Sequence, residues 1–264
     1  MTIPLSEKLR QAVRSVLGYR SPLYRLAALS LNTTMLWLKG GPAVARQINR
    51  LKHTAVPTSD VIQFANLLYP FRVRSHSSDI ETVISNFIRE EYGQLESDLP
   101  PRFIVDAGAY IGDTSAYFLS RFRECTVLAI EPLSENLLVA RENLEPYGGR
   151  VDLWHAALGS KRGFGRVGGE GTGATLGDAG ETVAIVTMAE VVAASPSGFI
   201  DILKMDIEGG EVEIFSTDAY KWLPQVRNII LETHGEHAER LVLSTLKAAN
   251  WKVQRYRNAW YCSA

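Results

Sequence analysis

Four side chains that can move a proton or bind a cation follow two predicted strands in the last third of the chain. Asp206 and Glu208 come directly after one buried apolar run, and Glu232 and His234 come directly after the next. Since the carboxyl ends of parallel strands line the ligand crevice of a doubly wound sheet, we expect these groups to converge. A neutral imidazole suits a general base near pH 7, and a carboxylate can orient the acceptor or a bound cation. We therefore predict that His234 and Asp206 are the catalytic residues.

The same groups also have simpler explanations. Asp206 can cap a helix, Glu211 can complement a helix N-terminus, and His234 can be a loop histidine with satisfied hydrogen bonds. Asp206, Glu208, Glu232 and His234 together also offer the oxygen and nitrogen ligands of a Mg²⁺ site. Their spacing permits a metal but does not require one, so a Mg²⁺ site stays an alternative that we do not favour.

A turn that contains one aspartate and two glycines follows the buried apolar run at 103–105. The turn reads DAGAYIG over residues 106–112, and Glu131 ends the next apolar run, 25 residues after Asp106. Gly108 and Gly112 would let the backbone approach a ligand closely. An acid after the second strand suits hydrogen bonds to a ribose diol. The pattern predicts a site for a nucleoside cofactor.

The turn distinguishes between two cofactor classes. A nicotinamide dinucleotide site typically has three glycines spaced G-x-G-x-x-G around the pyrophosphate. Here the position two residues before Gly108 is Asp106, whose charge would repel a pyrophosphate. An aspartate suits the ammonium and the cationic sulfur of S-adenosylmethionine (SAM). We expect SAM, with a nicotinamide cofactor as the alternative.

The elements that must position these groups alternate between strand and helix from about residue 100, which is typical of a parallel sheet. Ahead of them we expect a helix at 78–92 that begins with a capping Ser-Ser-Asp, and a short helix or strand within 60–73. We predict the Gly-rich segment 163–180 to be a mobile loop, since it is too rich in glycine for a helix. The predicted strands are 103–105, 127–130, 199–205 and 228–231.

Composition limits the alternatives. The chain has 264 residues, of which 46% are hydrophobic and 22% charged, with a net charge of −1. These values exclude wholesale disorder and an integral membrane bundle, and they give no reason to expect a nucleic-acid partner. Two cysteines, Cys125 and Cys262, are too few for a disulfide framework, so a reducing, cytoplasmic setting fits best. We expect neither a secretory signal nor a transmembrane segment.

The N-terminal part is strongly basic, since residues 1–55 contain nine Lys or Arg and one acid, Glu7. We expect helices at 5–17 and about 43–52, with a break at Gly40-Gly41-Pro42. The first helix carries an apolar stripe beside basic side chains, which suits an anionic membrane interface. Packing on the rest of the chain or a homo-oligomer interface is the favoured alternative. The stripe consists of Leu5, Leu9, Val13, Val16 and Leu17.

These motifs resemble those of the FkbM-type SAM-dependent methyltransferases. The most specific part is DILKMDIEGGE at 201–211, followed by ILETHG at 230–235. VDAGAYIGDTS at 105–115 and AIEPLSENLLVARENL at 129–144 agree with it, and SSD at 77–79 resembles the family's lead-in. The resemblance covers about 60–260 and leaves residues 1–55 outside. It implies a helical N-terminal extension over 1–58 and a SAM-dependent methyltransferase domain over 59–264.

The resemblance implies a Rossmann-like fold with a mostly parallel, seven-stranded sheet. It also implies methyl transfer to a hydroxyl oxygen of a sugar, glycolipid or secondary metabolite. Glu131 would hold the ribose hydroxyls, small side chains would leave room for adenine, and the glycine turn would surround the methionine part. The residues implied to bind the cofactor are Asp106, Gly108, Ala109, Tyr110, Gly112, Glu131, Pro132, Asn136, Ala156 and Ala157.

Two other functions stay open from the sequence. A nicotinamide-dependent oxidoreductase could use a similar sheet, although the missing third glycine and Asp106 oppose it. A SAM-binding module without turnover could keep the cofactor turn, although His234 and Asp206 would then have no chemical task. The acceptor, its regiochemistry and the oligomeric state do not follow from the residues.

Overall fold

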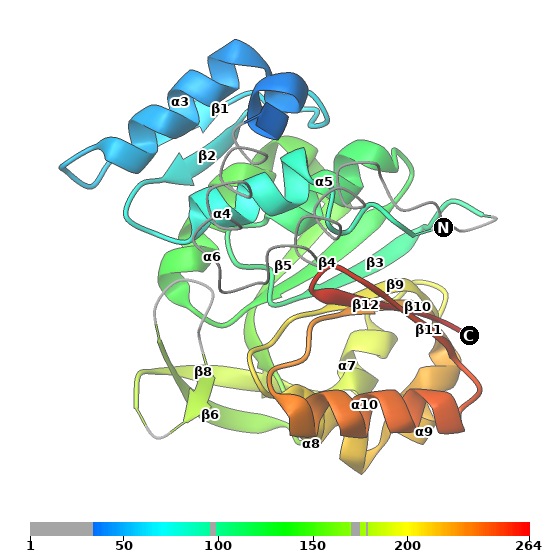
Figure 1. The fold of residues 1–264 in the computed structure, drawn as a ribbon. Coiled ribbons are helices and arrows are strands. Elements are labelled where there is room, and N and C mark those ends of the chain that lie inside the picture. Colours follow the sequence, from blue (N-terminus) through cyan, green and yellow to red (C-terminus); the bar gives the residue numbers. More distant parts are fainter. Residues whose placement is uncertain (1–33, 96–98, 170–174, 178) are drawn as a thin grey trace.

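The computed structural model describes residues 34–95, 99–169, 175–177 and 179–264. In this part of the chain the central feature is a ten-stranded sheet with helices on both faces (Figure 1). Its strand order is β11-β12-β10-β9-β3-β4-β5-β8-β6-β7. The first seven strands in that order form the expected Rossmann-like sheet, and β8, β6 and β7 extend it at one edge. The predicted α/β class is confirmed.

The four predicted strands form the middle of the sheet. They are β3 (Phe103–Ala107), β4 (Thr126–Glu131), β9 (Ile200–Met205) and β10 (Val226–Leu231), and they run parallel to one another. Both neighbours of β3 come later in the chain, so the winding reverses between β3 and β9. The remaining strands of the seven are β5 (Val151–Leu158), β11 (Lys252–Tyr256) and β12 (Ala259–Ser263), of which β12 pairs antiparallel with β10.

Alternation along the strands supplies a separate core on each face. Ile104 of β3 packs in one cluster, and its neighbour Val105 packs in the other. Because both faces are covered, the strands are apolar almost throughout, as in other parallel sheets. On one face lie α5 (Asp113–Arg121), α6 (Ser134–Leu144) and η3 (Glu145–Arg150). On the other lie α7 (Met188–Ala193), α8 (Glu211–Thr217), α9 (Ala219–Trp222), η4 (Leu223–Gln225) and α10 (Glu236–Ala248).

The segment before the sheet packs on the α5 face. Its apolar side chains share the cluster that contains Ile104 and Phe118. Residues 60–73 form parts of a two-stranded hairpin, and the predicted break at Gly40-Gly41-Pro42 lies between η1 and α3. Ser78 makes no capping side-chain bond, but the Ser77 hydroxyl accepts a hydrogen bond from the backbone N–H of Asp79 at 3.3 Å, so the predicted Ser-Ser-Asp cap is present at Ser77. The elements are η1 (Leu36–Gly40), α3 (Gly41–His53), β1 (Ser59–Ile62), β2 (Phe71–Arg74), α4 (Asp79–Val83) and η2 (Ile84–Ile88).

The predicted helix 5–17 and its apolar stripe lie outside the described residues. The domain boundary at residue 58 stays a prediction, although α3 and the hairpin share one apolar cluster. Within the described part of the chain, no helix is both long and apolar enough to cross a bilayer.

The Gly-rich segment differs from the prediction of a mobile loop. Residues Gly163–Gly168 form β6, which pairs antiparallel with β8 (Glu181–Val186), and Thr175–Gly177 form β7. The ladder to β8 satisfies the backbone of β6, and Val167 supplies a buried side chain, so glycine content alone does not prevent a strand. We call β6, β7 and β8 the β6–β8 arm; β6 and β8 are visible at the lower left of Figure 1.

Candidate functional site

The site lies where the carboxyl ends of β3, β4, β9 and β10 face the point of reversed winding. In open α/β sheets this is the position of the ligand crevice. Two cavities open there and share four lining residues, which are Gly108, Tyr110, Asp206 and Glu208. Their volumes are about 260 Å³ and about 400 Å³. A ligand could therefore reach from one cavity into the other past these four residues.

The smaller one, here called the apolar cavity, is lined mainly by hydrocarbon. Ala156 and Ala157 at the end of β5 leave space, and Glu131 is the buried acid at its wall, while Asp206, Glu208 and Glu213 line its other side. The predicted positions of Pro132, Ala156 and Ala157 agree with this lining. The other apolar walls come from Ile130, Leu158, Val167 and Ile207.

Glu131 is held by donors from three positions. Its carboxylate accepts hydrogen bonds from the backbone N–H groups of Tyr110 at 2.9 Å and Leu133 at 3.0 Å, and from the Asn136 amide at 3.4 Å. Burial raises the pKa of Glu131 to about 7, because desolvation outweighs these donors. The carboxylate thus has a fixed orientation at the wall of the apolar cavity. Asn136 lies behind it and does not line the cavity.

A polar network ties the turn at 106–112 to the hairpin and α4. Tyr110, at φ 50°, donates its hydroxyl to the fully buried Asp79 at 2.6 Å. Arg74 of β2 pairs with the same carboxylate at 2.9 Å and donates to the Asn136 side chain at 3.0 Å. Since Asn136 also reaches Glu131, the network runs from the hairpin to the wall of the apolar cavity. Sequence reasoning missed Arg74 and assigned Asp79 to a cap, because their partners are distant along the chain.

Asp106, predicted to meet the ammonium of the cofactor, lines neither cavity. It is fully buried, accepts a hydrogen bond from Ser115 at 2.6 Å and lies 3.2 Å from the Lys204 ammonium. Burial alone would lower the pKa of Lys204, but the carboxylates of Asp106, Asp206 and Asp113 raise it overall. The sequence predicts that Asp106 meets the ammonium of the cofactor. In the structure its ammonium partner is Lys204. Lys204 was missed, although a single cation in the apolar run 199–205 was a visible signal.

The two glycines of the turn, Gly108 and Gly112, are required by close contacts within the protein itself. At Gly108, with φ 78°, a Cβ would lie 1.8 Å from the carbonyl oxygen of Asp206, so only glycine allows β3 and β9 to approach. Lys204 donates to the Gly108 carbonyl at 2.6 Å. Gly112 faces Leu144 of α6, and neither Gly112 nor Ala109 lines the two cavities. Of the predicted turn residues, Gly108 and Tyr110 line the crevice.

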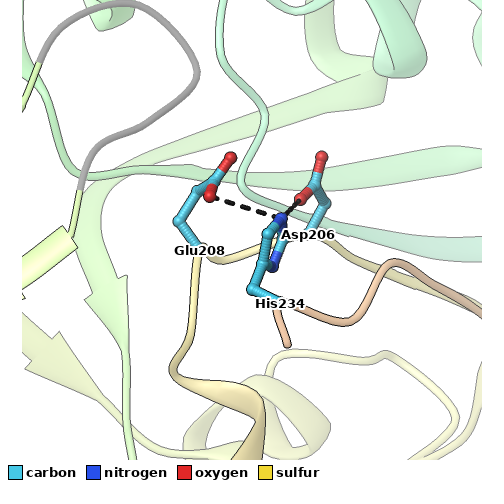
Figure 2. Close-up of side chains that lie close together, drawn as sticks. All are labelled: Asp206, Glu208 and His234. Atoms are coloured by element: carbon cyan, nitrogen blue, oxygen red, sulfur yellow. Dashed lines mark ion pairs between the residues drawn. The ribbon is translucent and has the colours of Figure 1, made fainter. Parts of the chain in front are cut away.

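His234 stands among three carboxylates, of which Asp206 and Glu208 are drawn in Figure 2. Its Nε2 atom lies 3.3 Å from Glu208 and 3.6 Å from Asp206, and its Nδ1 atom lies 3.0 Å from Glu211. Glu211 is fully buried at the start of α8, with one carboxylate oxygen unpartnered. Sequence reasoning saw Glu211 only as a helix N-terminal charge, because its contact with His234 arises from packing of the β9 and β10 ends.

The carboxylates decide the protonation state of His234. Its hydrogen bond to Glu211, together with the charges of Asp206 and Glu208, outweighs desolvation and raises its pKa to about 9. At pH 7 these contacts therefore favour the imidazolium over the neutral base that the sequence predicts. The imidazolium of His234 carries a proton on Nε2. The ring must release that proton before Nε2 can accept one from an acceptor hydroxyl.

The larger, polar cavity continues from this group toward α4 and α5. Glu232 lines it but is turned to Tyr92, whose hydroxyl donates to it at 2.8 Å. Burial raises the pKa of Glu232 and of Asp113 to about 7 each, and nearby Asp206 and Asp106 add to the respective shifts. The ligand atoms of Asp206, Glu208 and His234 lie within 4.8 Å of one another and could hold a cation. Glu232 is not part of that group.

Comparison with known proteins identifies the matched region and several similar folds. Residues 106–251, more than half of the chain, match the family profile described as "Methyltransferase FkbM domain". No curated protein matches the chain. Among solved structures, the chain is similar to methyltransferase FkbM from Methylobacillus flagellatus KT, with 16% identity and a TM-score of 0.48. That alignment covers 69% of this chain and 53% of the other, so the match spans about half the length of the Methylobacillus flagellatus protein.

Two further solved structures are similar over part of the chain. A methyltransferase from Geobacter sulfurreducens has 17% identity over 62% of this chain and 71% of that chain, with a TM-score of 0.39. TrmK from M. capricolum, solved with S-adenosyl-homocysteine, has 12% identity over 66% of this chain and 65% of that chain, also with a TM-score of 0.39.

Proposed function

The chain belongs to the FkbM methyltransferase domain family, and from this premise we propose that it is a SAM-dependent O-methyltransferase. Its acceptor would be a hydroxyl group of a sugar, glycolipid or secondary metabolite. One observation carries the proposal: an apolar cavity with a fixed acid joins a polar cavity at Gly108 and Asp206, beside His234. This arrangement has room for a nucleoside on one side and for a hydroxyl acceptor on the other.

The residues of the crevice suit SAM. Ala156 and Ala157 leave space for a flat ring, and Glu131 is oriented for the ribose hydroxyls. Oδ1 of Asp206 is buried without a hydrogen-bond partner among the described residues, so it can accept from the ammonium of the methionine part. When bound, SAM supplies a methyl group on a positively charged sulfur.

The chain's own task is to align the acceptor and to remove its proton. In-line transfer needs the acceptor oxygen to be held on the side of the crevice that faces His234. Nε2 of His234 would take the hydroxyl proton, while Glu211 holds the ring through Nδ1 at 3.0 Å. Asp206 and Glu208 would orient the hydroxyl and stabilise the imidazolium that forms.

His234 can act as a base only after its pKa falls from about 9. A cation that binds beside Asp206 and Glu208 offsets the negative charge that stabilises the imidazolium, so it lowers this pKa. We infer that cofactor binding and release of the Nε2 proton are coupled. The base would then become available only when the crevice is loaded.

Mg²⁺ at Asp206, Glu208 and His234 stays the alternative that we do not favour. It would replace the proton at Nε2 and could bind two neighbouring hydroxyls of the acceptor. Dialysis of the full chain against a chelator tests it. Loss of methyl transfer that Mg²⁺ restores would support the metal, whereas unchanged transfer would exclude a required metal.

Two assays test the proposed function. Calorimetric titration with SAM, S-adenosylhomocysteine and NADH should give binding of the first two and no heat with NADH; the opposite result would point to an oxidoreductase. Transfer of a radiolabelled methyl group into a panel of glycans and hydroxylated metabolites should label at least one acceptor at oxygen. Cofactor binding with no labelled product across the panel would favour a binding module without turnover.

A further inference from the structure

The polar cavity has no aliphatic side chain in its lining, as far as the described residues go. Its walls consist of carboxylates, hydroxyl and amide groups, two basic side chains, two tyrosines and one glycine. The apolar cavity, in contrast, has hydrocarbon walls from Ile130, Val167 and Ile207. At about 400 Å³ the polar cavity has the size of a small-molecule site. A ligand with a mostly polar surface, such as a sugar ring, fits these walls better than an apolar metabolite.

Two carboxylates lie on the acceptor side of the crevice alone. Asp206 and Glu208 line both cavities, so the positive charge of SAM can account for them. Glu91 and Glu232 line the polar cavity and not the apolar one. The cofactor therefore does not explain why these two acids, from segments far apart in the chain, face the same cavity.

The other two acids of the polar cavity have partners within the protein. Glu81 is exposed, and its carboxylate lies 3.9 Å from the ammonium of Lys52. Asp113 accepts a hydrogen bond from the side-chain amide of Asn86. Neither of them needs a ligand to satisfy its charge.

Glu91 is a buried acid with one weak partner. Its side chain belongs to a residue that is 4% exposed, and among the described residues its carboxylate accepts one hydrogen bond, from the backbone N–H of Asn258 at 3.5 Å. That distance is beyond the usual range for such a bond. The backbone of Glu91 is fixed by the Ser85 carbonyl, to which it donates at 3.1 Å, and by the Tyr261 hydroxyl, from which it accepts. A buried carboxylate is costly unless it is paired, so Glu91 is suited to a donor from a ligand.

Glu232 lies near Glu91. The Tyr92 hydroxyl donates to one of its carboxylate oxygens at 2.8 Å, and the negative charge of Glu91 raises its pKa, so the two carboxylates repel each other. Lys204 offsets part of this charge, but its ammonium is already held by Asp106 at 3.2 Å and by a backbone carbonyl. Within the described part of the chain, no Lys, Arg or His forms an ion pair with Glu91 or Glu232.

This pair of acids suits an ammonium better than a metal. Mg²⁺ needs several oxygen ligands in a fixed geometry. Among the described residues, the group whose ligand atoms are close enough to hold a metal consists of Asp206, Glu208 and His234, without Glu91 or Glu232. An ammonium has three rotatable donors and can bind two carboxylates at once.

We propose that Glu91 and Glu232 bind a protonated amine of the acceptor, and that the acceptor is an amino sugar methylated at a hydroxyl oxygen. This inference rests on the proposed function and narrows its acceptor class. The hydroxyl oxygen takes the methyl group from SAM, its proton passes to Nε2 of His234, and S-adenosylhomocysteine leaves. Sugars that carry a phosphate or a carboxylate would be repelled from this cavity.

The test measures transfer of a radiolabelled methyl group from SAM to matched sugars by the full chain at neutral pH. The panel consists of glucosamine, galactosamine and deacetylated chito-oligosaccharides, each beside its N-acetylated form and its counterpart with a hydroxyl in place of the amine. For at least one amine, kcat/KM should exceed that of both counterparts by roughly 10- to 100-fold, the range for a hydrogen bond to a charged group. The label should be on oxygen.

Variants assign the preference to the two acids. Glu91→Gln and Glu232→Gln keep the shape of the side chain, and each should raise KM for the amine by roughly 10- to 100-fold. In Glu91→Gln, kcat for the amine, KM for the neutral counterparts and SAM affinity should stay unchanged, which a merely structural role would not predict. Glu90→Gln is the matched control, because Glu90 is the adjacent acid, pairs with Lys39 at 3.8 Å and lines neither cavity.

Several outcomes would overturn the inference. They are equal or better transfer to the neutral or acetylated sugars, label on the amine nitrogen, and an unchanged KM in Glu91→Gln. If the glutamine variants do not fold, the comparison of matched sugars with the wild-type protein still decides. Label in an apolar hydroxylated metabolite and in none of these sugars would contradict the inference and leave the proposed function standing. Absence of SAM binding, or of label in every acceptor, would contradict both.

Discussion

The two cavities share Gly108, Tyr110, Asp206 and Glu208, but their remaining walls are built differently. The apolar cavity is enclosed by small and branched hydrocarbon side chains, with Glu131 as its oriented acid. The polar cavity collects Glu232, Asp113, Lys204 and His234. The charge of Lys204 interacts with those of Asp113 and Glu232, and the charge of His234 interacts with those of Asp206, Glu208 and Glu211. The shape of the apolar cavity follows from the size of each lining side chain. The charge state of the polar cavity depends on all of its ionisable side chains together.

The sequence-based predictions differ in accuracy between the two cavities. Ala156, Ala157 and Pro132, for which the sequence predicts a cofactor contact, line the apolar cavity. Around the polar cavity, Asp106 is neutralised by Lys204, and His234 is charged because of Glu211 and its neighbours. Residue type predicts shape well, but it predicts protonation poorly, since a pKa depends on every nearby charge.

The largest effect should come from the base. His234→Ala should lower kcat by about 10²- to 10⁴-fold, the usual contribution of general-base catalysis, and should bind SAM no more weakly than wild type, because the imidazolium that opposes the cofactor's positive charge is absent. His237→Ala, an exposed histidine three residues later, is the matched control and should keep full activity. Loss of SAM binding with an unchanged maximal rate would mean that His234 belongs to the cofactor side of the crevice.

A large effect on stability should come from the buried ion pair. Lys204→Met leaves Asp106 as an uncompensated buried charge, so the free energy of unfolding should fall by about 3–5 kcal/mol. Lys247→Met, at an exposed position on α10, should change it little. Denaturant titration measures both. The double variant with Asp106→Asn should recover part of the loss, and an equally low stability would argue against pairing with Asp106.

A smaller effect is expected in the apolar cavity. Glu131→Ala should weaken SAM binding by roughly 1–3 kcal/mol, the scale for losing a charged hydrogen-bond partner. Glu135→Ala, exposed on α6, is the control for the change of charge. Calorimetry of the folded variants gives both values. An unchanged affinity in Glu131→Ala would contradict the proposal that Glu131 binds the ribose hydroxyls. Only the shape of the cavity would then support cofactor binding there.

The last expected effect is a pH dependence that distinguishes His234 from a neutral histidine. Its folded-state pKa of about 9 exceeds the ordinary value of 6.5. The imidazolium therefore stabilises the fold fully below about pH 6.5, and this contribution is lost as the pH rises through about 9. The difference in unfolding free energy between wild type and His234→Ala should be larger at pH 6 than at pH 10. A difference that grows with pH would show that His234 is neutral in the fold.

Much of the fold follows from local pattern. The apolar runs at 103–105, 127–130, 199–205 and 228–231 correspond to β3, β4, β9 and β10, and their motifs identified the family. Strand β6, within the segment 163–180, was mistaken for part of a loop, because its stability comes from the ladder to β8 and from the Val167 cluster. Neither contact leaves a trace in the composition of a Gly-rich segment.

The sequence by itself determined which chemical groups stand at the ends of the strands, because strand, turn and acid are local features of the chain. Only the tertiary structure decided which of those groups are free. Lys204 reaches Asp106 across the β3–β9 boundary, and Glu211 reaches His234 between the ends of β9 and β10. Buried charges interact strongly over a few ångströms, and those distances are set by packing of residues far apart in sequence.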